Sequence, residues 1–261
     1  MKNILKIIFA FIPFWVSAQG DFRGRFDDLQ KYEWKEIFED SGRENWRLKW
    51  FLDGDLASVE NSHEGMIIHA GLIAGSDANH AVLWTKDIFE GKNLKIEYKF
   101  TRIDTSLANT VNIIYIMAQG GGGKSPDITE WAHERREPAM SKYFNNMDTY
   151  HVSYAVSGTE PASESDRYIR GRRYMPLAGE GLRGTELLPE YMNVPLFEPG
   201  AMYQMTFIKD GRELFMRVEG NDKDMIFYFD ATGFPEIEKG RIGLRQMFTR
   251  VSCYSDIKIF K

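Results

Sequence analysis

The chain has 261 residues, of which 43% are hydrophobic and 14% aromatic, and its formal net charge at pH 7 is −5. This length and composition support a sizeable core and fit one large domain. The net negative charge argues against general nucleic-acid binding, because a phosphate backbone attracts basic surfaces. Cys253 is the only cysteine, which excludes an internal disulfide and a cysteine-ligated zinc site.

The first residues show the pattern of a secretory signal peptide. Lys2 and Lys6 precede an apolar run at residues 7–16, and small residues end at Ala18. We therefore expect residues 1–18 to be cleaved and the protein to be exported, either to the periplasm or outside the cell. The apolar run is too short to span a bilayer comfortably, and we expect no membrane span in the rest of the chain.

The remainder is expected to form an N-terminal arm or short helix at residues 19–45 and a single domain at residues 46–261. Alternating apolar and polar side chains between turn residues indicate strands. In the first half of the domain, the expected strands lie at residues 46–53, 56–61, 65–70, 80–85, 94–103 and 110–118. The last of these is apolar on both faces apart from Asn112 and Tyr115, which is typical of a central strand.

Residues 127–147 form the longest candidate helix, which Pro138 interrupts, and we expect this insertion to cross one end of the sheets. Residues 175–199 are rich in proline and are expected to be irregular. The later strands are expected at residues 149–158, 166–174, 201–209, 213–219, 224–230, 240–247 and 251–260. About a dozen short strands with hardly any helix predict an all-β jelly-roll sandwich with a few short helical insertions.

The stretch Thr149–Gly158, TYHVSYAVSG, separates two kinds of side chain by alternation. Tyr150 and Tyr154 fall on a bulky apolar face that suits a core. His151 and Ser153 fall on a face of small polar side chains, which is typical of the floor of a binding cleft. We expect His151 to act on a ligand there; the alternative is a histidine that is solvated or bonded for structural reasons.

A group of arginines follows in residues 166–174. Arg170 and Arg172 share a strand face with Tyr168 and Tyr174, whereas the other two arginines lie on the opposite face. We expect Arg170 and Arg172 to contact an anionic ligand, because a guanidinium pairs with carboxylate or sulfate through two bonds. The alternative is a solvated strand edge whose arginines discourage edge-to-edge pairing.

Further candidates lie on other strands and in the insertion. Arg245 shares a face with Gly243, and a glycine permits close approach of a ligand. Asn112 would need a partner if buried, either a ligand or a structural one. His80 follows a loop and could supply a second imidazole, and Trp131 could stack on a sugar ring.

Several segments resemble the concanavalin A-like jelly rolls: IFEGKNLKIEYKFTRID, YHVSYAV, LFEPGAMYQMTFIKDG and the closing GRIGLRQMFTRVSCYSDIKIF. Over residues 46–261 the chain is most similar to the YesU-type family of bacterial polysaccharide-utilisation clusters. The closing segment is shared widely among carbohydrate-binding jelly rolls, whereas YHVSY and the arginine segment are more specific. Relatives in that family are tied to pectin and ulvan breakdown. The resemblance therefore implies a dehydratase or lyase that produces an unsaturated uronate.

β-Elimination from a uronate needs a base near C5, an acid near O4 and groups that neutralise the carboxylate as negative charge builds up. Histidine and tyrosine suit the acid and base roles, and arginine and asparagine suit the carboxylate. The expected catalytic residues are His151, Tyr168 and Arg245. The expected substrate-binding residues are Arg170, Arg172, Asn112, His80 and Trp131.

Two alternatives remain open for the function: a non-catalytic carbohydrate-binding jelly roll and a glycoside hydrolase. No strand offers the two carboxylates, about 5–5.5 Å apart, that a retaining glycosidase needs. The patterns E-x-D-x-x-E, H-E-x-x-H and G-x-S-x-G are absent from the sequence. We expect no required cofactor and assign no metal ligands, although the fold class allows a structural calcium.

Overall fold

The computed structural model describes residues 15–106, 110–157, 167–176 and 181–261. The chain divides into two compact units, Met1–Tyr32 and Glu33–Lys261. The described element of the first unit is helix α1, Trp15–Gln30, which includes the expected cleavage position, while most of the expected signal peptide lies outside the described residues. No helix in the described ranges is long and apolar enough to cross a membrane.

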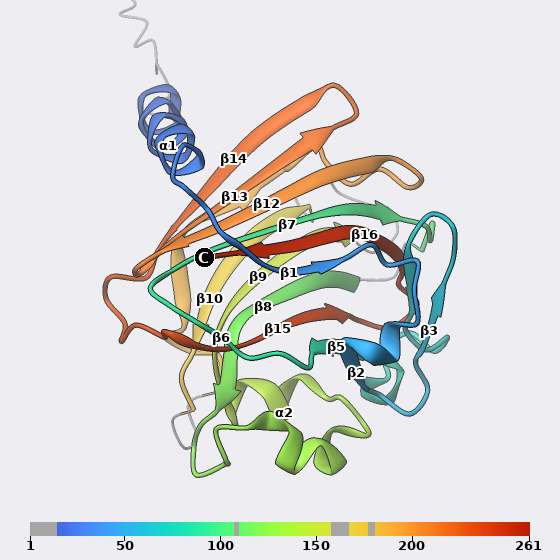
Figure 1. Cartoon of the computed structure of the whole chain (residues 1–261). Helices are drawn as coiled ribbons and strands as arrows, with labels where there is room; N and C mark the ends of the chain where they lie inside the picture. Colours follow the sequence, from blue (N-terminus) through green and yellow to red (C-terminus); the bar gives the residue numbers. More distant parts are fainter. Residues whose placement is uncertain (1–14, 107–109, 158–166, 177–180) are drawn as a thin grey trace, which may run out of the picture. The chain divides into compact units, whose positions relative to one another are not determined.

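The second unit is built from antiparallel strands that form two sheets (Figure 1). Sheet A contains, in spatial order, β3 Ser58–Asn61, β4 Met66–His69, β16 Val251–Phe260, β7 Asn93–Arg102, β12 Met202–Asp210, β13 Glu213–Gly220 and β14 Lys223–Asp230, with β1 Glu36–Asp40 also paired to β16. Sheet B contains β2 Trp50–Asp53, β5 Ala81–Thr85, β15 Lys239–Gln246, β8 Thr110–Gly120, β9 Met147–Ser157, β10 Tyr168–Tyr174 and β11 Glu186–Met192, with β6 Phe89–Glu90 on β15. The sheets meet at one edge, where Leu188 of β11 pairs with Asp230 of β14.

The main core lies between the two sheets and is filled from both. Tyr98 of β7 and Tyr154 of β9 are fully buried there and join their hydroxyl groups at 3.0 Å. Because side chains alternate along a strand, the residues directly before and after each tyrosine point to the other face of its sheet. The predicted assignment of Tyr154 to the core, with His151 on the opposite face, is therefore confirmed.

Two expected boundaries differ from the structure. Strand β1 pairs with β16, so the sheet begins before Trp46, where η1 Trp46–Leu48 instead forms a short 3-10 helix. The expected irregular stretch at residues 175–199 contains strand β11. Pro189 is accommodated there because the register with β10 shifts between Ile169 and Gly171, which frees the neighbouring ladder positions of β11 from regular pairing.

The expected long helix at residues 127–147 is also different. It forms a 3-10 helix, η3 Ile128–Arg135, and a short α-helix, α2 Met140–Phe144, which are separated around Pro138 (Figure 1). A further 3-10 helix, η2 Asp77–Asn79, lies before β5. We call residues 128–144 the cap segment. Its buried side chains pack on the outer face of sheet B, the face turned away from the main core.

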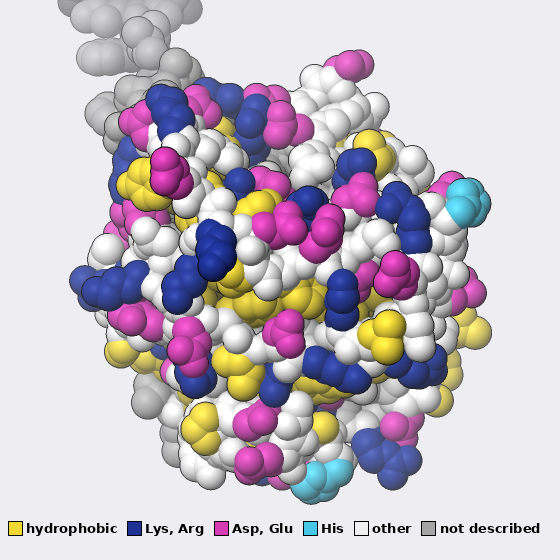
Figure 2. All heavy atoms as spheres, in the orientation of Figure 1, with side chains coloured by type: hydrophobic (Ala, Val, Ile, Leu, Met, Phe, Trp, Pro, Cys, Tyr) yellow, Lys and Arg dark blue, Asp and Glu magenta, His cyan; other side chains and the backbone are white. Residues whose placement is uncertain are grey.

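Charges of both signs are interspersed over the face of the molecule that Figure 2 shows. Many exposed charges are paired, as Arg217 is with Asp224 and Lys258 with Glu36. Such a mixed surface creates little field of a single sign. This face of the molecule therefore offers an anion no broad positive patch.

We predict that Gly243→Ala destabilises sheet B. Gly243 lies opposite Trp84, and a Cβ atom at position 243 would stand 2.4 Å from Trp84 Cζ3. Overpacking of this kind costs about 1–3 kcal/mol. Urea unfolding should show that loss for Gly243→Ala but a change under about 0.5 kcal/mol for Gly233→Ala, because a Cβ at Gly233 meets nothing within 4 Å. Equal stability of the two variants would contradict the close approach.

Candidate functional site

The outer face of sheet B carries a row of side chains that crosses five strands. Cross-strand pairing aligns Trp84, Gly243, Tyr115, His151 and Arg172, from β5, β15, β8, β9 and β10. The adjacent row on the same face consists of Arg245, Ile113, Ser153 and Arg170. This face therefore combines aromatic, basic and small polar groups with aliphatic side chains such as Ile113 and Val82.

His151 is buried and is held by hydroxyl groups at both ring nitrogens. Its Nδ1 lies 2.6 Å from the Tyr174 hydroxyl and its Nε2 lies 2.5 Å from Ser153 Oγ. Burial, followed by the positive charges of Arg172 and Arg245, places the pKa of His151 well below its usual value of 6.5. The imidazole is therefore neutral at pH 7, with one nitrogen donating a hydrogen bond and the other accepting one.

Arg245 is fully buried beside His80. Its Nη2 donates to His80 Nδ1 at 2.6 Å and to the Pro138 carbonyl at 2.7 Å. Because a guanidinium can only donate, His80 Nδ1 accepts and its proton sits on Nε2. Burial and then the charge of Arg245 lower the pKa of His80 to about 3. Phe248 stacks on the His80 ring at a centroid distance of 5.2 Å.

Several buried polar atoms in this group have no hydrogen-bond partner among the described residues. They are Nε and Nη1 of Arg245, Nε2 of His80 and the hydroxyl of Tyr115. The Tyr115 hydroxyl lies close to Arg245 and Tyr174, since both affect its pKa, but it makes no bond of normal geometry to them. Buried donors without acceptors are rare and costly in folded proteins, so this cluster calls for an explanation.

The cap segment covers these residues through Tyr143 of α2. The Tyr143 ring stacks on Tyr115 at 5.9 Å and on Trp84 at 6.4 Å, and the Arg245 guanidinium carbon lies 4.5 Å from its centroid. The Tyr143 hydroxyl donates to Asp53 Oδ2 at 3.0 Å. In this conformation Arg245 and His151 are therefore closed off from solvent on the cap side.

Arg170 and Arg172 lie at the more accessible side of the same face. Their side chains are 29% and 17% exposed and form ion pairs with Glu190 and Glu186 of β11. The Arg170 guanidinium carbon sits 3.9 Å from the centroid of Tyr168. These arginines share the face of His151, as the alternation predicted, but acidic neighbours already pair with them.

The expected residues divide into those that this face brings together and those that it does not. His80, His151, Tyr168, Arg170, Arg172 and Arg245 lie on it. Asn112 points between the sheets, where its Nδ2 donates to Ser252 Oγ and the Tyr254 hydroxyl. Its partners are structural, so it cannot serve the same cleft as His151. Trp131 is buried in the cap segment with Arg135 stacked on its ring at 4.2 Å, so that ring face is not open to a sugar.

The group also includes residues that were not among the expected catalytic and substrate-binding residues. Tyr174 rather than Tyr168 contacts His151, and Ser153 contacts its other nitrogen. Tyr115 was visible only as a polar interruption in an apolar strand. Tyr143 and Asp53 had no local signal, because their positions depend on how the cap segment folds onto the sheet.

No group of three or more His, Cys, Asp or Glu side chains in the described ranges could hold a metal ion. The structural calcium that the fold class allows therefore has no such cluster among these residues. The chemistry that this face offers is hydrogen bonding and charge: two neutral imidazoles, one buried guanidinium and the phenols of Tyr115 and Tyr174.

Comparisons with known proteins agree on the fold. A family model described as "Domain of unknown function (DUF1961)" matches residues 43–259. The crystal structure of a protein of unknown function with a galectin-like fold from Bacillus subtilis superimposes with a TM-score of 0.67 at 19% identity, covering 87% of this chain and 97% of the other. No curated protein sequence matches this chain.

Two more distant structures contain bound sugars. The exoplasmic/lumenal domain of VIP36 in its Ca2+/Man3GlcNAc-bound form has a TM-score of 0.54 and 11% identity, covering 86% of this chain and 90% of the other. The basic winged bean lectin with Tn-antigen has a TM-score of 0.54 and 8% identity, covering 87% and 98%. These likenesses confirm the predicted concanavalin-like jelly roll. The uronate-specific relatives that the sequence resemblance implied stay a prediction.

We predict that His80 and His151 make the protein less stable in mild acid. Both have a folded pKa below the unfolded value of 6.5. Each therefore favours folding above pH 6.5 and loses that contribution as the pH falls below it, because the unfolded chain binds the proton more tightly. The loss is at most about 1.4 kcal/mol per pH unit for each residue.

Urea unfolding at pH 7 and pH 5 measures this effect. His80→Gln and His151→Gln should each reduce the difference in unfolding free energy between the two pH values. His63→Gln is the control, since the His63 side chain is 91% exposed. If all three variants keep the difference of the native chain, the two histidines are not held neutral.

Proposed function

We propose that this chain, which belongs to the family described as "Domain of unknown function (DUF1961)", binds an acidic oligosaccharide on the outer face of sheet B. The observation that carries the proposal is Arg245, a fully buried guanidinium with two nitrogens that lack an acceptor in the described structure. A carboxylate or sulfate oxygen on a sugar would accept a charge-assisted hydrogen bond from one of these nitrogens.

The groups around Arg245 suit the rest of a sugar. The Nε2–H of His80 donates a hydrogen bond, and the Tyr115 hydroxyl both donates and accepts. His80 Nε2 has no partner among the described residues, and the Tyr115 hydroxyl makes only bonds of poor geometry with Arg245 and Tyr174. Sugar hydroxyls need such mixed donors and acceptors. The stacked aromatic rings of Trp84 and Tyr115 lie next to these protein groups. An acidic sugar unit would therefore satisfy the atoms that the protein leaves unsatisfied.

Arg170 and Arg172 provide the accessible end of the same surface. Their ion pairs with Glu190 and Glu186 are partly exposed and hence weak, so an anionic glycan can exchange with the carboxylates. They lie on β10, next to His151 and Ser153 of β9. A chain carrying several acidic units could contact these arginines while one unit reaches Arg245.

Entry of a sugar to Arg245 requires the cap segment to move, because Tyr143 covers the guanidinium. Opening would break the hydrogen bonds of Arg135 and Tyr143 to Asp53, a cost that the bonds between the sugar and Arg245 would have to offset. The VIP36 domain and the winged bean lectin named above hold bound sugars, which supports a sugar as the ligand class.

We predict that Arg245→Gln weakens binding of an acidic oligosaccharide by at least about 30-fold, because loss of one partner of a buried charge pair costs roughly 2–5 kcal/mol. Isothermal titration calorimetry with a panel of uronate oligosaccharides, including ulvan and pectin fragments, measures this. Tyr115→Phe removes a single hydroxyl and should weaken binding by about 5- to 10-fold.

Arg212→Gln is the matched control, since Arg212 is exposed and donates to the Thr232 carbonyl on sheet A's side of the sandwich. It should bind as the native chain does. Thermal unfolding confirms that each variant is folded. Equal affinity of the Arg245 and Arg212 variants, or no binding of any acidic oligosaccharide by the native chain, would contradict the proposed function.

A second function, β-elimination on the bound uronate, is supported by His151. The neutral imidazole of His151 could accept the C5 proton, Arg245 could neutralise the carboxylate, and the phenol of Tyr174 or Tyr115 could protonate the leaving oxygen at C4. Burial raises the pKa of both tyrosines above 10, so each keeps its proton at pH 7. Tyr174 takes the place that the sequence assigned to Tyr168.

Ultraviolet absorbance of the C4–C5 double bond tests this second function. The native protein should produce a rise in absorbance with uronate oligosaccharides, and His151→Gln should lower the rate by about 10²- to 10⁴-fold. His63→Gln should leave the rate unchanged. Retained binding without any rise in absorbance across the panel would reject catalysis and leave carbohydrate binding alone.

A further inference from the structure

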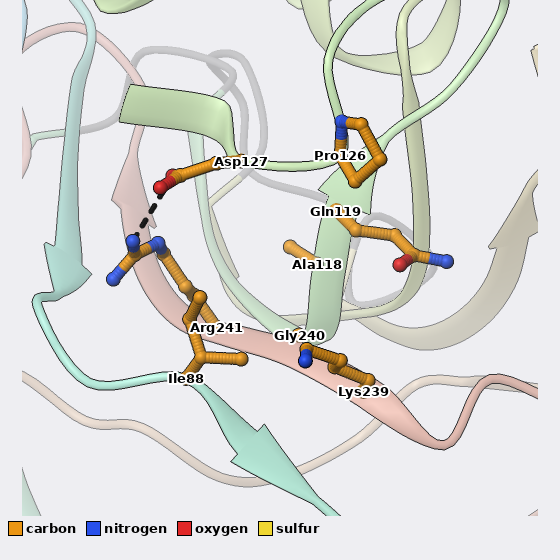
Figure 3. A pocket seen from close by; sticks show the side chains of 8 residues that line it. All are labelled: Ile88, Ala118, Gln119, Pro126, Asp127, Lys239, Gly240 and Arg241. Carbon is orange, nitrogen blue, oxygen red and sulfur yellow. Dashed lines mark hydrogen bonds and ion pairs between the residues drawn. The ribbon is translucent and has the colours of Figure 1, made fainter. Parts of the chain in front are cut away.

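A pocket of about 210 Å3 lies at the end of sheet B where β8 ends and β15 begins (Figure 3). It is formed by the end of β8, the start of β15 and the residues that lead into η3. Its lining consists of Ile88, Ala118, Gln119, Pro126, Asp127, Lys239, Gly240 and Arg241. Pockets for drug-sized ligands have volumes of about 300–1,000 Å3. This one therefore suits a ligand of about one ring.

The polar groups of the pocket combine acceptors and donors. Asp127 Oδ1 accepts from Arg241 Nη2 at 3.0 Å and from Thr129 N at 3.0 Å, while Asp127 Oδ2 has no hydrogen bond from a described residue. The Gln119 amide donates to Asp148 Oδ2 at 3.3 Å, which leaves its oxygen without a partner in the same ranges. The pocket thus has an acceptor oxygen on each side, that of Asp127 next to Arg241 and that of Gln119 on the opposite wall (Figure 3).

The charges in and around the pocket balance. Arg241 is paired with Asp127, and Lys239 is paired with Glu90 at 2.5 Å. The remaining acidic neighbour, Asp148, is paired with Arg173. An anionic ligand would find no excess positive charge here, in contrast to the Arg245 guanidinium, which forms no ion pair with a described residue. Ile88, Pro126 and Ala118 add apolar wall for the C–H faces of a ring.

We propose that this pocket binds one neutral sugar unit. Its hydroxyl groups donate to Asp127 Oδ2 and to the Gln119 oxygen and accept from Lys239, and its apolar face lies against Ile88 and Pro126. The choice of a sugar as ligand class rests on the proposed function. The pocket itself does not, because it shares none of the residues around Arg245.

The distance between the pocket and the Arg245 group limits which glycans could contact both. Arg241 pairs with Ala118 on β8, and Gly243 pairs with Tyr115. Three residues of a strand span roughly 10 Å. The neutral-sugar pocket and the Arg245 group therefore lie a few sugar units apart at most on one sheet, which fits a heteropolysaccharide of acidic and neutral units.

Ligand-observed NMR with the full chain tests the proposal. The panel contains the methyl glycosides of glucose, galactose, mannose, xylose and rhamnose, with glucuronate as the acidic comparison. At least one neutral glycoside should bind with a Kd on the order of 1–10 mM, as expected for a ligand of one ring. Ile88→Trp fills the pocket and should abolish that signal.

Ile103→Trp is the matched control, because Ile103 and Ile88 are both 42% exposed and only Ile88 lines the pocket. It should leave binding of the neutral sugar intact. Arg245→Gln should also leave it intact while weakening the binding of acidic oligosaccharides at the Arg245 group. Three results would each overturn the proposal. The neutral glycoside still binds to Ile88→Trp, glucuronate binds to the native chain but not to Ile88→Trp, or no neutral glycoside binds at all.

Discussion

The carboxylate of Asp53 is the group on which the outer face of sheet B depends. Its Oδ2 accepts hydrogen bonds from Arg135 Nε at 2.6 Å, Trp84 Nε1 at 2.8 Å and the Tyr143 hydroxyl at 3.0 Å. One oxygen thus joins β2, β5 and both helices of the cap segment. A buried carboxylate is tolerated only when it is paired and bonded in this way. Burial still raises the pKa of Asp53 despite the opposing effect of Arg135.

This junction places Tyr143 on Trp84 and Tyr115 and over Arg245, so the stability of the cap segment and the burial of Arg245 are linked. The protein leaves donors of Arg245 and His80 unsatisfied beneath it. Unpaired buried donors reduce stability, and natural proteins keep such costs mainly at sites that serve a function. The same cap segment begins beside the pocket near Asp127, which places both proposed sugar contacts along one short insertion.

Alternation along single strands could be predicted from the sequence. It separated His151 from Tyr154, grouped Arg170 with Arg172, and placed Arg245 beside Gly243, because the side-chain period of a strand is a local property. Asn112 was assigned to the cleft incorrectly, since a strand that is apolar on both faces does not reveal which face is the cleft. The cap segment, Asp53 and Tyr143 were not predictable, because they meet only through contacts between distant parts of the chain. The resemblance to the concanavalin-like jelly rolls predicted the fold correctly, while its uronate chemistry remains a proposal.

We propose above that the Nε and Nη1 donors of Arg245 bind the acidic group of a glycan. The most direct measurement is 15N-edited NMR of arginine Nε–H resonances, assigned by comparison with Arg245→Gln, during titration with acidic oligosaccharides. We expect the chemical shift of the Arg245 Nε–H resonance to change strongly on binding. The resonances of arginines already paired in sheet A, such as Arg217, should not shift. Binding that leaves the Arg245 signal unchanged would contradict this proposal.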